Sequence, residues 1–258
     1  MTADPGDAAL PRERQDRIME RLRRHGRVIA ADLAVEFRVS EDSIRRDLRE
    51  LAARSLCKRV YGGALLPSDT PPLAERRREH VERKRALAAT AVTLVSRRQI
   101  LFIDAGSTNS AIASALPEGY DLTVVTNAPD VALALIGRSG FEVLTIGGRI
   151  DPEIGGTTGA MALRQIQGIR ADLCFPGVCA ADAETGLWTL DAEEVVLKRT
   201  MIEASGDTVL VATREKLMRA ATHHTAPVSS LTHLVTERDT DPAILDAWRA
   251  AGISVHVT

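Results

Sequence analysis

The chain has 258 residues, of which 45% are hydrophobic and 26% are charged, and its formal net charge is −2. This composition is that of an ordinary globular protein, and the length accommodates two domains or one large domain with an appendage. Residues 10–66 carry 14 Lys and Arg against 9 Asp and Glu, whereas residues 67–258 are net acidic. A basic N-terminal segment followed by a net acidic remainder favours contact with nucleic acid through the N-terminal segment alone.

The cysteines and the N-terminus exclude several other classes of protein. Cys57, Cys174 and Cys179 form no disulfide framework, and their spacing matches no zinc pattern. Residues 1–10 are acidic, lack the basic start and apolar core of a signal peptide, and are expected to be disordered. No apolar run reaches the roughly 18 residues needed to span a bilayer. We therefore expect a cytoplasmic protein with reduced thiols, no metal, no cofactor and no membrane partner.

Residues 11–66 predict three helices followed by a hairpin. The first helix covers Arg14 to Arg24 and the second covers Ala30 to Phe37. A tight turn over Arg38 to Ser40 leads into the third helix. Two helices joined by a short turn, the second with an Arg-rich face, are typical of a helix-turn-helix.

The third predicted helix, which follows Ser40, has two different faces. Ser40 is a favourable N-cap, because its hydroxyl accepts a hydrogen bond from the first turn. Apolar residues recur at i, i+4 and i+7, while the opposite face carries guanidinium and hydroxyl groups that suit a major groove. The candidate DNA contacts are Ser40, Ser43, Arg45, Arg46 and Arg49. A charged helix exposed to solvent is the alternative interpretation.

Leu56 to Leu66 predicts a small hairpin that would form the wing of a winged helix. Its strands would be Val60-Tyr61 and Ala64-Leu65, with Gly62-Gly63 as the turn. Three side chains of this segment are candidate contacts to DNA, namely Lys58, Arg59 and Tyr61.

Residues 67–83 predict a linker and the start of a connecting helix. The sequence PSDTPP resists both helix and sheet, and a helical pattern then extends from Leu73 to Val95. The basic run Arg76 to Arg78 is interpreted as a solvated face of this helix rather than a second DNA contact.

Residues 84–258 predict an α/β domain with a mostly parallel sheet. Short apolar runs alternate with helical segments, which is typical of strands covered on both faces. Strands are expected at 100–104, 123–127, 142–146, 171–177, 208–212, 231–235 and 253–257. Helices are expected at 110–116, 131–136, 193–204 and 241–251.

Polar and glycine-rich segments follow several of these strands, at the edge where parallel sheets bind ligands. Asp104 to Thr108 lies between a strand and a helix, where backbone N–H groups and hydroxyls suit a phosphate. Asn127 ends the next strand, and Gly147-Gly148-Arg149 would bring backbone and a guanidinium near an anion. A fourth segment runs from Asp182 to Lys198. Helix capping by these groups is the alternative, as is an i, i+4 salt bridge for Lys198.

Residues 14–64 resemble the N-terminal domain of the DeoR family of bacterial transcriptional regulators. The matching positions are Arg14, Ile18, Leu22, Ser40, Ile44, Arg45, Arg46, Asp47 and Leu48. Ser43 stands where the family commonly has Thr, and the family's Gly-Gly-Ala wing is present from Gly62 to Ala64. The resemblance implies a winged helix-turn-helix that binds an operator in double-stranded DNA.

Residues 84–256 resemble the effector domain of the same family, which is similar in fold to ribose-5-phosphate isomerase and binds sugar phosphates. The resemblance adds Asp191 and Lys198 of a Glu-x-x-x-Lys run, and Lys216 after the following strand, to the strand-end residues above. The implied effector site comprises Asp104, Gly106, Ser107, Thr108, Asn127, Gly147, Gly148, Arg149, Asp191, Lys198 and Lys216. The segment from Gly177 to Asp182 and Thr213 depart from the family pattern where the sugar should bind.

The sequence therefore predicts a repressor of carbohydrate-metabolism genes whose DNA binding is modulated by a phosphorylated sugar, in a homo-oligomer, either dimer or tetramer. Two alternatives remain open. One is a sugar-phosphate isomerase with a DNA-binding appendage, for which Asp104, Asp182, Asp191 and Lys216 are the available catalytic groups. The other is a DNA-binding protein whose sensor no longer binds a ligand.

Overall fold

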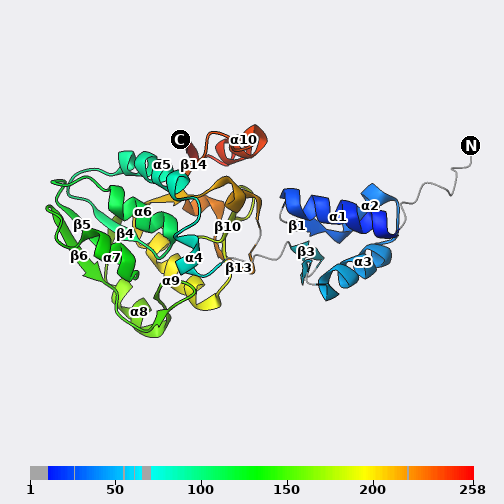
Figure 1. Ribbon diagram of the computed structural model, residues 1–258, viewed down its shortest axis with the longest axis horizontal. Helices are drawn as coiled ribbons and strands as arrows, with labels where there is room; N and C mark the ends of the chain where they lie inside the picture. The colour runs from blue at the N-terminus through cyan, green and yellow to red at the C-terminus, as the bar shows by residue number, and fades with distance from the viewer. Residues whose placement is uncertain (1–10, 26, 55, 61, 66–70, 220) are drawn as a thin grey trace, which may run out of the picture. The chain divides into compact units, whose positions relative to one another are not determined.

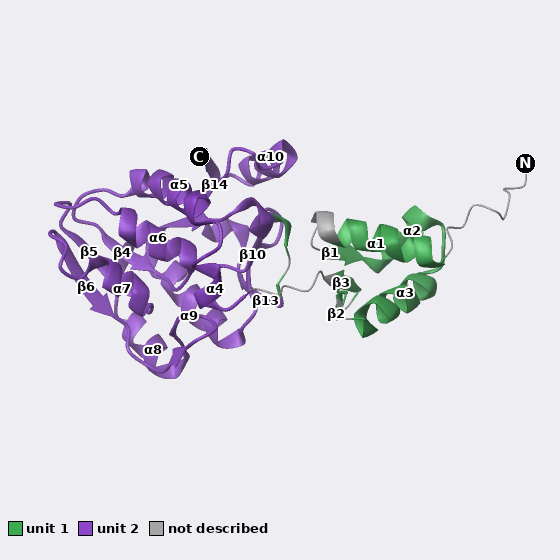
Figure 2. Cartoon of the chain, viewed as in Figure 1, with its two compact units in different colours: residues 1–69, 218–221 green, residues 70–217, 222–258 purple. Residues whose placement is uncertain are grey.

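The structure, a computed structural model, describes residues 11–25, 27–54, 56–60, 62–65, 71–219 and 221–258. The chain divides into two compact units (Figure 2). Unit 1 comprises residues 1–69 and 218–221, and unit 2 comprises residues 70–217 and 222–258. We describe each unit by itself.

Unit 1 contains the three predicted helices and a small antiparallel sheet. The helices are α1 (Pro11–His25), α2 (Ala30–Phe37) and α3 (Glu41–Ala53), and the strands are β1 (Arg27–Ile29), β2 (Lys58–Val60) and β3 (Gly63–Leu65), in the order β1-β3-β2. The hairpin is therefore confirmed, but its first strand lies two residues earlier than predicted, and β1 was not predicted. A Cβ on Gly63 would lie 2.0 Å from the carbonyl oxygen of Val28, so only glycine allows β3 to approach β1 this closely.

The large sheet of unit 2 has seven strands and every pair in it is parallel, as the alternating pattern predicts. Its strands are β4 (Ile100–Ile103), β5 (Leu122–Thr126), β6 (Phe141–Thr145), β9 (Ala171–Phe175), β12 (Ser205–Val211), β14 (His233–Thr236) and β15 (Ser254–Val257). The order is β15-β14-β12-β9-β4-β5-β6. The chain thus builds outward from β4 in one direction and from β9 in the other, and the switch point lies between these two strands.

Helices cover both faces of this sheet (Figure 1). On one face lie α5 (Val81–Ala91), α6 (Ser107–Ala115) and α7 (Pro129–Leu135), and on the other lie α8 (Gly159–Ile166), α9 (Ala192–Glu203) and α10 (Pro242–Ala250). Successive strand residues face opposite layers, since Leu101 and Ile103 pack with the first set of helices and Phe102 packs with the second. The fold class expected from the sequence, α/β with a winged helix-turn-helix followed by a parallel sheet, is confirmed.

The remaining elements are short and lie outside the large sheet. They are α4 (Leu73–Arg76), η1 (Val92–Leu94), η2 (Arg214–Met218), η3 (Val228–Ser230), the hairpin β7 (Ile150–Asp151) and β8 (Gly156–Thr157), and the antiparallel sheet of β10 (Ala180–Asp182), β11 (Gly186–Thr189) and β13 (His223–Ala226). The single helix predicted over 73–95 is wrong. A turn separates α4 from α5, and His80 in it adopts a left-handed conformation with φ of 51°.

Candidate functional site

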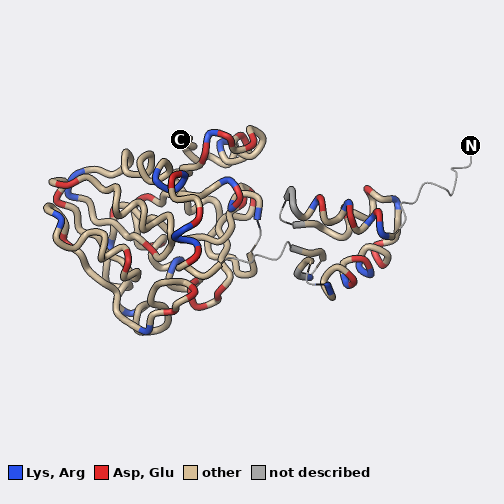
Figure 3. Tube along the Cα trace, in the orientation of Figure 1, with Lys and Arg blue, Asp and Glu red and all other residues tan. Residues whose placement is uncertain are grey.

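The third helix of unit 1 presents the face that the sequence predicts. The Ser40 hydroxyl accepts a hydrogen bond from the backbone N–H of Ser43 at 3.3 Å, so the predicted N-cap is confirmed. The apolar stripe of this helix is buried, while the guanidinium face is exposed. Figure 3 shows basic and acidic positions alternating along α3. The exposed basic residues of the face are Arg45, Arg46 and Arg49.

The three arginines of this face differ in their partners. Arg45 forms ion pairs with Glu41 at 2.7 Å and with Asp42 at 3.6 Å on its own helix. The Nε of Arg49 donates to the backbone oxygen of Arg45 at 3.2 Å. Arg46 forms no ion pair with any residue that the structure describes. Arg46 and Arg49 are therefore the two guanidinium groups of this face with which no carboxylate of a described residue pairs.

Asp47 of the same motif has a structural role. Its carboxylate is 2% exposed and accepts a hydrogen bond from Arg14 Nε at 2.5 Å and a weaker one from Gln15 at 3.4 Å. Because Arg14 and Gln15 lie on α1, this buried cluster fixes α1 against the helix that carries the arginines. The motif spacing from Arg14 to Asp47 thus reflects packing rather than DNA contact.

The wing supplies one described candidate. Arg59 is exposed at the centre of β2, opposite Ala64 of β3. The side chain of Lys58 and the whole of Tyr61, which the sequence predicts as DNA contacts, lie outside the described residues.

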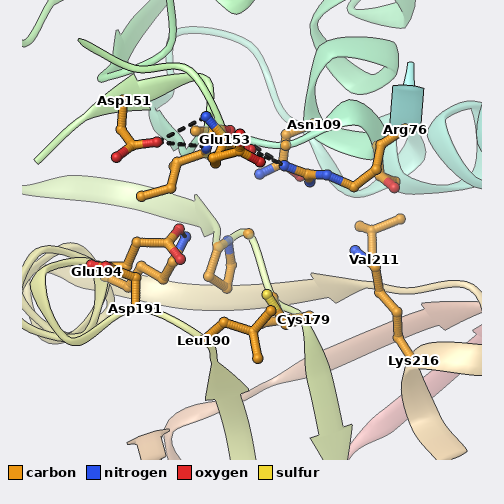
Figure 4. A pocket seen from close by; sticks show the side chains of 18 residues that line it. Arg76, Asn109, Asp151, Glu153, Cys179, Leu190, Asp191, Glu194, Val211 and Lys216 are labelled. Atoms are coloured by element: carbon orange, nitrogen blue, oxygen red, sulfur yellow. Dashed lines mark hydrogen bonds and ion pairs between the residues drawn. The ribbon is translucent and has the colours of Figure 1, made fainter. Parts of the chain in front are cut away.

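A pocket of about 290 Å³ lies in unit 2 at the switch point of the sheet (Figure 4). The loops after β4 and β9, the first turns of α6 and α9, the loop between β7 and β8, and η2 all contribute to it, and Arg76 of α4 completes its wall. The volume approaches that of a cleft for a small metabolite. Parallel sheets bind ligands at this place, where the strand order reverses.

The start of α6 offers unpaired polar groups to this pocket. No side chain caps the helix at Gly106, so its first N–H groups are available to a ligand. Thr108 lines the pocket and is 4% exposed, and its hydroxyl has no hydrogen-bond partner among the described residues. Asn109 is held by hydrogen bonds from its Nδ2 to the backbone oxygens of Asp104 at 2.9 Å and Phe175 at 2.8 Å. These two bonds tie the loop after β4 to the loop after β9.

A buried cluster of one lysine and two carboxylates forms another wall of the pocket. Lys198 Nζ lies 2.5 Å from Asp104 and 2.9 Å from Glu194, and its side chain is 3% exposed. Burial alone would lower the pKa of Lys198, but the carboxylates of Asp104 and Glu194 raise it above its ordinary value. Asp104 also accepts hydrogen bonds from the backbone N–H groups of Ala105 and Gly177. The predicted i, i+4 pair is confirmed, as part of a larger cluster.

Lys216 is a second lysine of the pocket with the opposite environment. It belongs to η2 and forms no ion pair with a described residue. Its pKa is lowered to about 8, mainly by burial and in smaller part by the nearby cations Arg76, Lys84 and Lys198, against the opposing effect of Cys179. In Figure 4 its ammonium group extends toward the side of the pocket where Arg76 and Asn109 lie.

The pocket therefore has two chemically different ends. Figure 4 shows Lys216, Arg76 and Asn109 on one side, with Asp191 and Glu194 on the other. The first end carries two cations with which no carboxylate of a described residue pairs, and the second carries Asp191 and Glu194; Asp151 and Glu153, from β7 and the loop after it, also line the pocket. Such a pocket fits a molecule with an anionic group at one end and hydroxyl groups at the other.

The structure places the predicted effector residues in three groups. Those lining the pocket are Gly106, Thr108, Asp191, Lys198 and Lys216, while Asp104 lies directly behind Lys198. Asn127 is buried, and its side chain bonds Ala105 N–H and the Thr157 carbonyl. Ser107, Gly147, Gly148 and Arg149 are outside the pocket lining. Sequence reasoning missed Arg76 and Asn109, and Glu194, although it lies in the candidate segment from Asp182 to Lys198, was not among the predicted effector residues.

The carboxylates that an isomerase would need have other partners. Asp104 pairs with Lys198, and Asp191 caps α9 by accepting hydrogen bonds from the N–H groups of Glu193 and Glu194. Asp182 accepts hydrogen bonds from the N–H and hydroxyl groups of Thr185 in the turn between β10 and β11. Among the described residues, no group of three or more His, Cys, Asp or Glu forms a candidate metal site, and no helix is long and apolar enough to cross a membrane.

Comparison with known proteins identifies the family. Residues 14–70 match the family model of the DeoR-like helix-turn-helix domain, and residues 79–238 match that of the DeoR C terminal sensor domain. The chain belongs to the DeoR family. It is 33% identical over 227 residues to the glycerol-3-phosphate regulon repressor of Escherichia coli, covering 87% of this chain and 90% of that one. It is also 31% identical over 249 residues to the HTH-type transcriptional regulator GlpR of Haloferax volcanii, covering 95% and 97%.

Among solved structures, ribose 5 phosphate isomerase A from Neisseria gonorrhoeae aligns over 54% of each chain, with 16% identity and a TM-score of 0.39. As a DeoR-family member, the chain is a transcriptional regulator with a helix-turn-helix domain and a sensor domain, and it is not an enzyme. The family expected from the sequence is thereby confirmed, and the isomerase alternative is not favoured.

Proposed function

We propose that this DeoR-family protein represses genes of carbohydrate metabolism and that a phosphorylated sugar, bound at the switch-point pocket, modulates its binding to operator DNA. The observation that supports the effector class is the division of the pocket into a cationic end and a carboxylate end. A phosphate requires the first and sugar hydroxyls suit the second. A glycerol-3-phosphate regulon repressor among the relatives is consistent with this class of effector.

The phosphate occupies the cationic end in this proposal. Lys216 supplies a charge with no competing carboxylate, and the unpartnered hydroxyl of Thr108 donates a hydrogen bond. The free N–H groups after Gly106 add the positive end of the α6 dipole. Charge-assisted bonds of this kind contribute about 1.5–3 kcal/mol each. The phosphate thus accounts for most of the affinity.

The other predicted residues position this site. Asp104 and Lys198 fix the loop after β4 against α9, and Asn127 fixes the same loop from β5. Ser107 begins α6, and Gly147, Gly148 and Arg149 lead into β7, whose loop to β8 lines the pocket. The sugar hydroxyls meet Asp191 and Glu194 at the carboxylate end.

On the DNA side, we propose that α3 enters the major groove and that the wing contacts the backbone. Ser40, Ser43 and the three exposed arginines face the groove, while Arg59, Lys58 and Tyr61 contact phosphate. Helix-turn-helix proteins place two recognition helices on half-sites about one helical turn apart. We therefore propose that the protein acts on an operator in the cytoplasm as a homo-oligomer.

Fluorescence anisotropy with DNA from upstream of the protein's own gene tests this function. Salt is held constant, because phosphate contacts make affinity depend on it. The titration is repeated with glycerol 3-phosphate, ribose 5-phosphate, glucose 6-phosphate, fructose 6-phosphate and fructose 1-phosphate, and with each unphosphorylated parent compound. We expect the DNA affinity to change with one phosphorylated compound and not with its parent. A DNA affinity that none of these compounds changes would mean that the sensor binds another class of ligand or none.

A further inference from the structure

The α4 turn contributes to the effector pocket although it lies far from the rest of the pocket in sequence. Arg76, its last residue, lines the pocket beside the loop between β7 and β8 (Figure 4). The same turn lies within the first ten residues of unit 2, directly after the helix-turn-helix unit in the chain. Arg76 therefore belongs both to the pocket and to the segment that joins the sensor to the DNA-binding unit.

The Arg76 guanidinium is held in place without a neutralising partner. Its Nε donates to the backbone oxygen of Pro71 at 2.8 Å, and one terminal nitrogen donates to the backbone oxygen of Glu153 at 2.9 Å. The other terminal nitrogen forms no hydrogen bond with a described residue, and none of these residues' carboxylates pairs with the guanidinium. A positive charge that is oriented by carbonyls and left with free donors at a pocket is suited to bind an anion.

Contacts of Leu73 and Arg76 hold the two ends of α4 on the sensor, and Arg77, which follows it, pairs with Asp130 of α7. Lys84 of α5 is buried and donates from Nζ to the backbone oxygens of Arg76 and Glu79. Leu73 donates its N–H to Glu153 at 3.2 Å, and its side chain occupies the space beside Gly155, where a Cβ would lie 1.9 Å away. A change at the Arg76 guanidinium is thus transmitted directly to a short turn of four residues.

The helix after this turn, α5, also supports the second cation of the pocket, Lys216. Arg83 of α5 donates to both carboxylate oxygens of Glu215, at 2.8 and 2.9 Å, and also pairs with Glu237. Glu215 immediately precedes Lys216 in η2. The α4–α5 segment (residues 73–91) therefore supports both cations, Arg76 by carrying it and Lys216 by anchoring its turn.

We propose that Arg76 binds the phosphate of the effector directly, and that the α4–α5 segment thereby transmits the occupancy of the pocket to the DNA-binding unit. This inference rests on the proposed function. A ligand shifts a conformational equilibrium only by as much as its affinity differs between the two states. Arg76 supplies that difference, because the phosphate gains its guanidinium contact only when α4 is docked on the pocket.

The test compares four variants of the full chain. Arg76→Gln retains a donor for the carbonyls and loses the charge, and Arg76→Lys retains the charge and loses the planar fork. Arg77→Gln is the matched control, because Arg77 is adjacent, pairs with Asp130 at 2.6 Å and does not line the pocket. Lys216→Gln removes the other cation and reports on the proposed site itself. Thermal melting of each variant verifies that it is folded.

Two quantities are measured for each protein. Isothermal titration calorimetry gives the affinity for inorganic phosphate and for each phosphorylated compound of the panel, which separates binding of free phosphate from binding of a phosphate ester. Fluorescence anisotropy gives the ratio of DNA Kd values with and without saturating ligand. This ratio is the coupling factor, and it is independent of changes in ligand affinity alone.

We expect Arg76→Gln to weaken binding of the phosphate ester about 10- to 100-fold, as for a lost charge-assisted contact. We expect its coupling factor to fall toward 1, with Arg76→Lys intermediate and Arg77→Gln equal to the wild type. Loss of binding in Lys216→Gln with wild-type binding in Arg76→Gln would overturn the inference and leave the proposed function standing. Weak binding with a wild-type coupling factor would refute transmission by α4. Failure of the wild type to bind any phosphate compound would overturn both.

Discussion

Replacing Lys198 by Met tests whether the charge of this buried lysine is needed to stabilise the two buried carboxylates beside it, Asp104 and Glu194. Lys198, Asp104 and Glu194 have side chains that are 3%, 1% and 10% exposed. Methionine fills most of the volume of the lysine stem but provides no charge. Two carboxylates then remain buried with only neutral donors, which are the N–H groups of Ala105 and Gly177 for Asp104 and the hydroxyl of Thr189 for Glu194.

The expected loss of folding stability is large, because the buried carboxylates are too little exposed for water to solvate their charges. Removing one partner of a buried ion pair costs about 3–5 kcal/mol. For a chain of 150–250 residues each kcal/mol shifts the melting temperature by roughly 2–4 °C, so the sensor unit should melt roughly 6–20 °C lower. The double variant Asp104→Asn with Lys198→Met removes one of the stranded charges and should recover part of this loss.

The stability of Lys198→Met should depend on pH, because its two buried carboxylates can take up protons. A stranded carboxylate is relieved when it takes up a proton, and the folded state gains more from this than the unfolded state. The stability difference between wild type and Lys198→Met should therefore be largest at pH 8 and shrink toward pH 5. Calorimetric melting at both pH values measures it, with Arg85→Met, at an exposed helix pair, as the control. A variant that melts with the wild type at pH 8 would refute this reasoning.

Three further predictions concern single side chains. Lys216, whose pKa is about 8, should be protonated when it binds phosphate, so ligand affinity should fall up to about tenfold for each pH unit above 8. Titration calorimetry from pH 7 to 9 measures this. The affinity of Lys216→Gln should not change over the same range. Arg46→Ala should weaken operator binding by about 1–3 kcal/mol if it contacts a base, or lower the salt slope by about 1 if it contacts a phosphate; unchanged anisotropy in both respects would exclude a DNA contact. Asp47→Ala removes the acceptor shared by Arg14 and Gln15 and should destabilise unit 1 by about 3–5 kcal/mol. Thermal melting followed by far-UV circular dichroism measures this. A melting temperature equal to that of the wild type would contradict the structural role of Asp47.

The parallel sheet was predictable because each of its strands is a short apolar run that needs no partner to be recognised. Strands β4, β5 and β9 appear at the predicted positions for this reason. The two-residue strands β7 and β8 are too short to show any period, and α8 is eight residues long and begins at a glycine. These elements exist through their contacts with the sheet, which a local pattern does not contain.

The site was predictable to the extent that its residues follow strands. Thr108 and Lys216 both stand after a strand of the sheet, and topology alone brings strand ends together. Arg76 carries no such signal. It lies within a basic run whose usual environment is solvent, and its contact with Glu153 joins residues 77 positions apart. Asp47 shows the reverse case, because a motif typical of DNA binding contains a residue that holds two helices together.

The two pocket lysines explain why a phosphate should bind at one end only. Lys198 is neutralised by two carboxylates, so its cluster carries a net negative charge and repels an anion at short range. Lys216 has no such partner in the part of the chain that the structure describes, and its lowered pKa reflects a charge that burial disfavours in the absence of an anion. A phosphate is therefore attracted electrostatically by Lys216 and Arg76 and repelled by the carboxylates around Lys198. In the proposed site, this difference orients the ligand before any sugar hydroxyl is recognised, and the identity of the sugar should then depend on the carboxylate end.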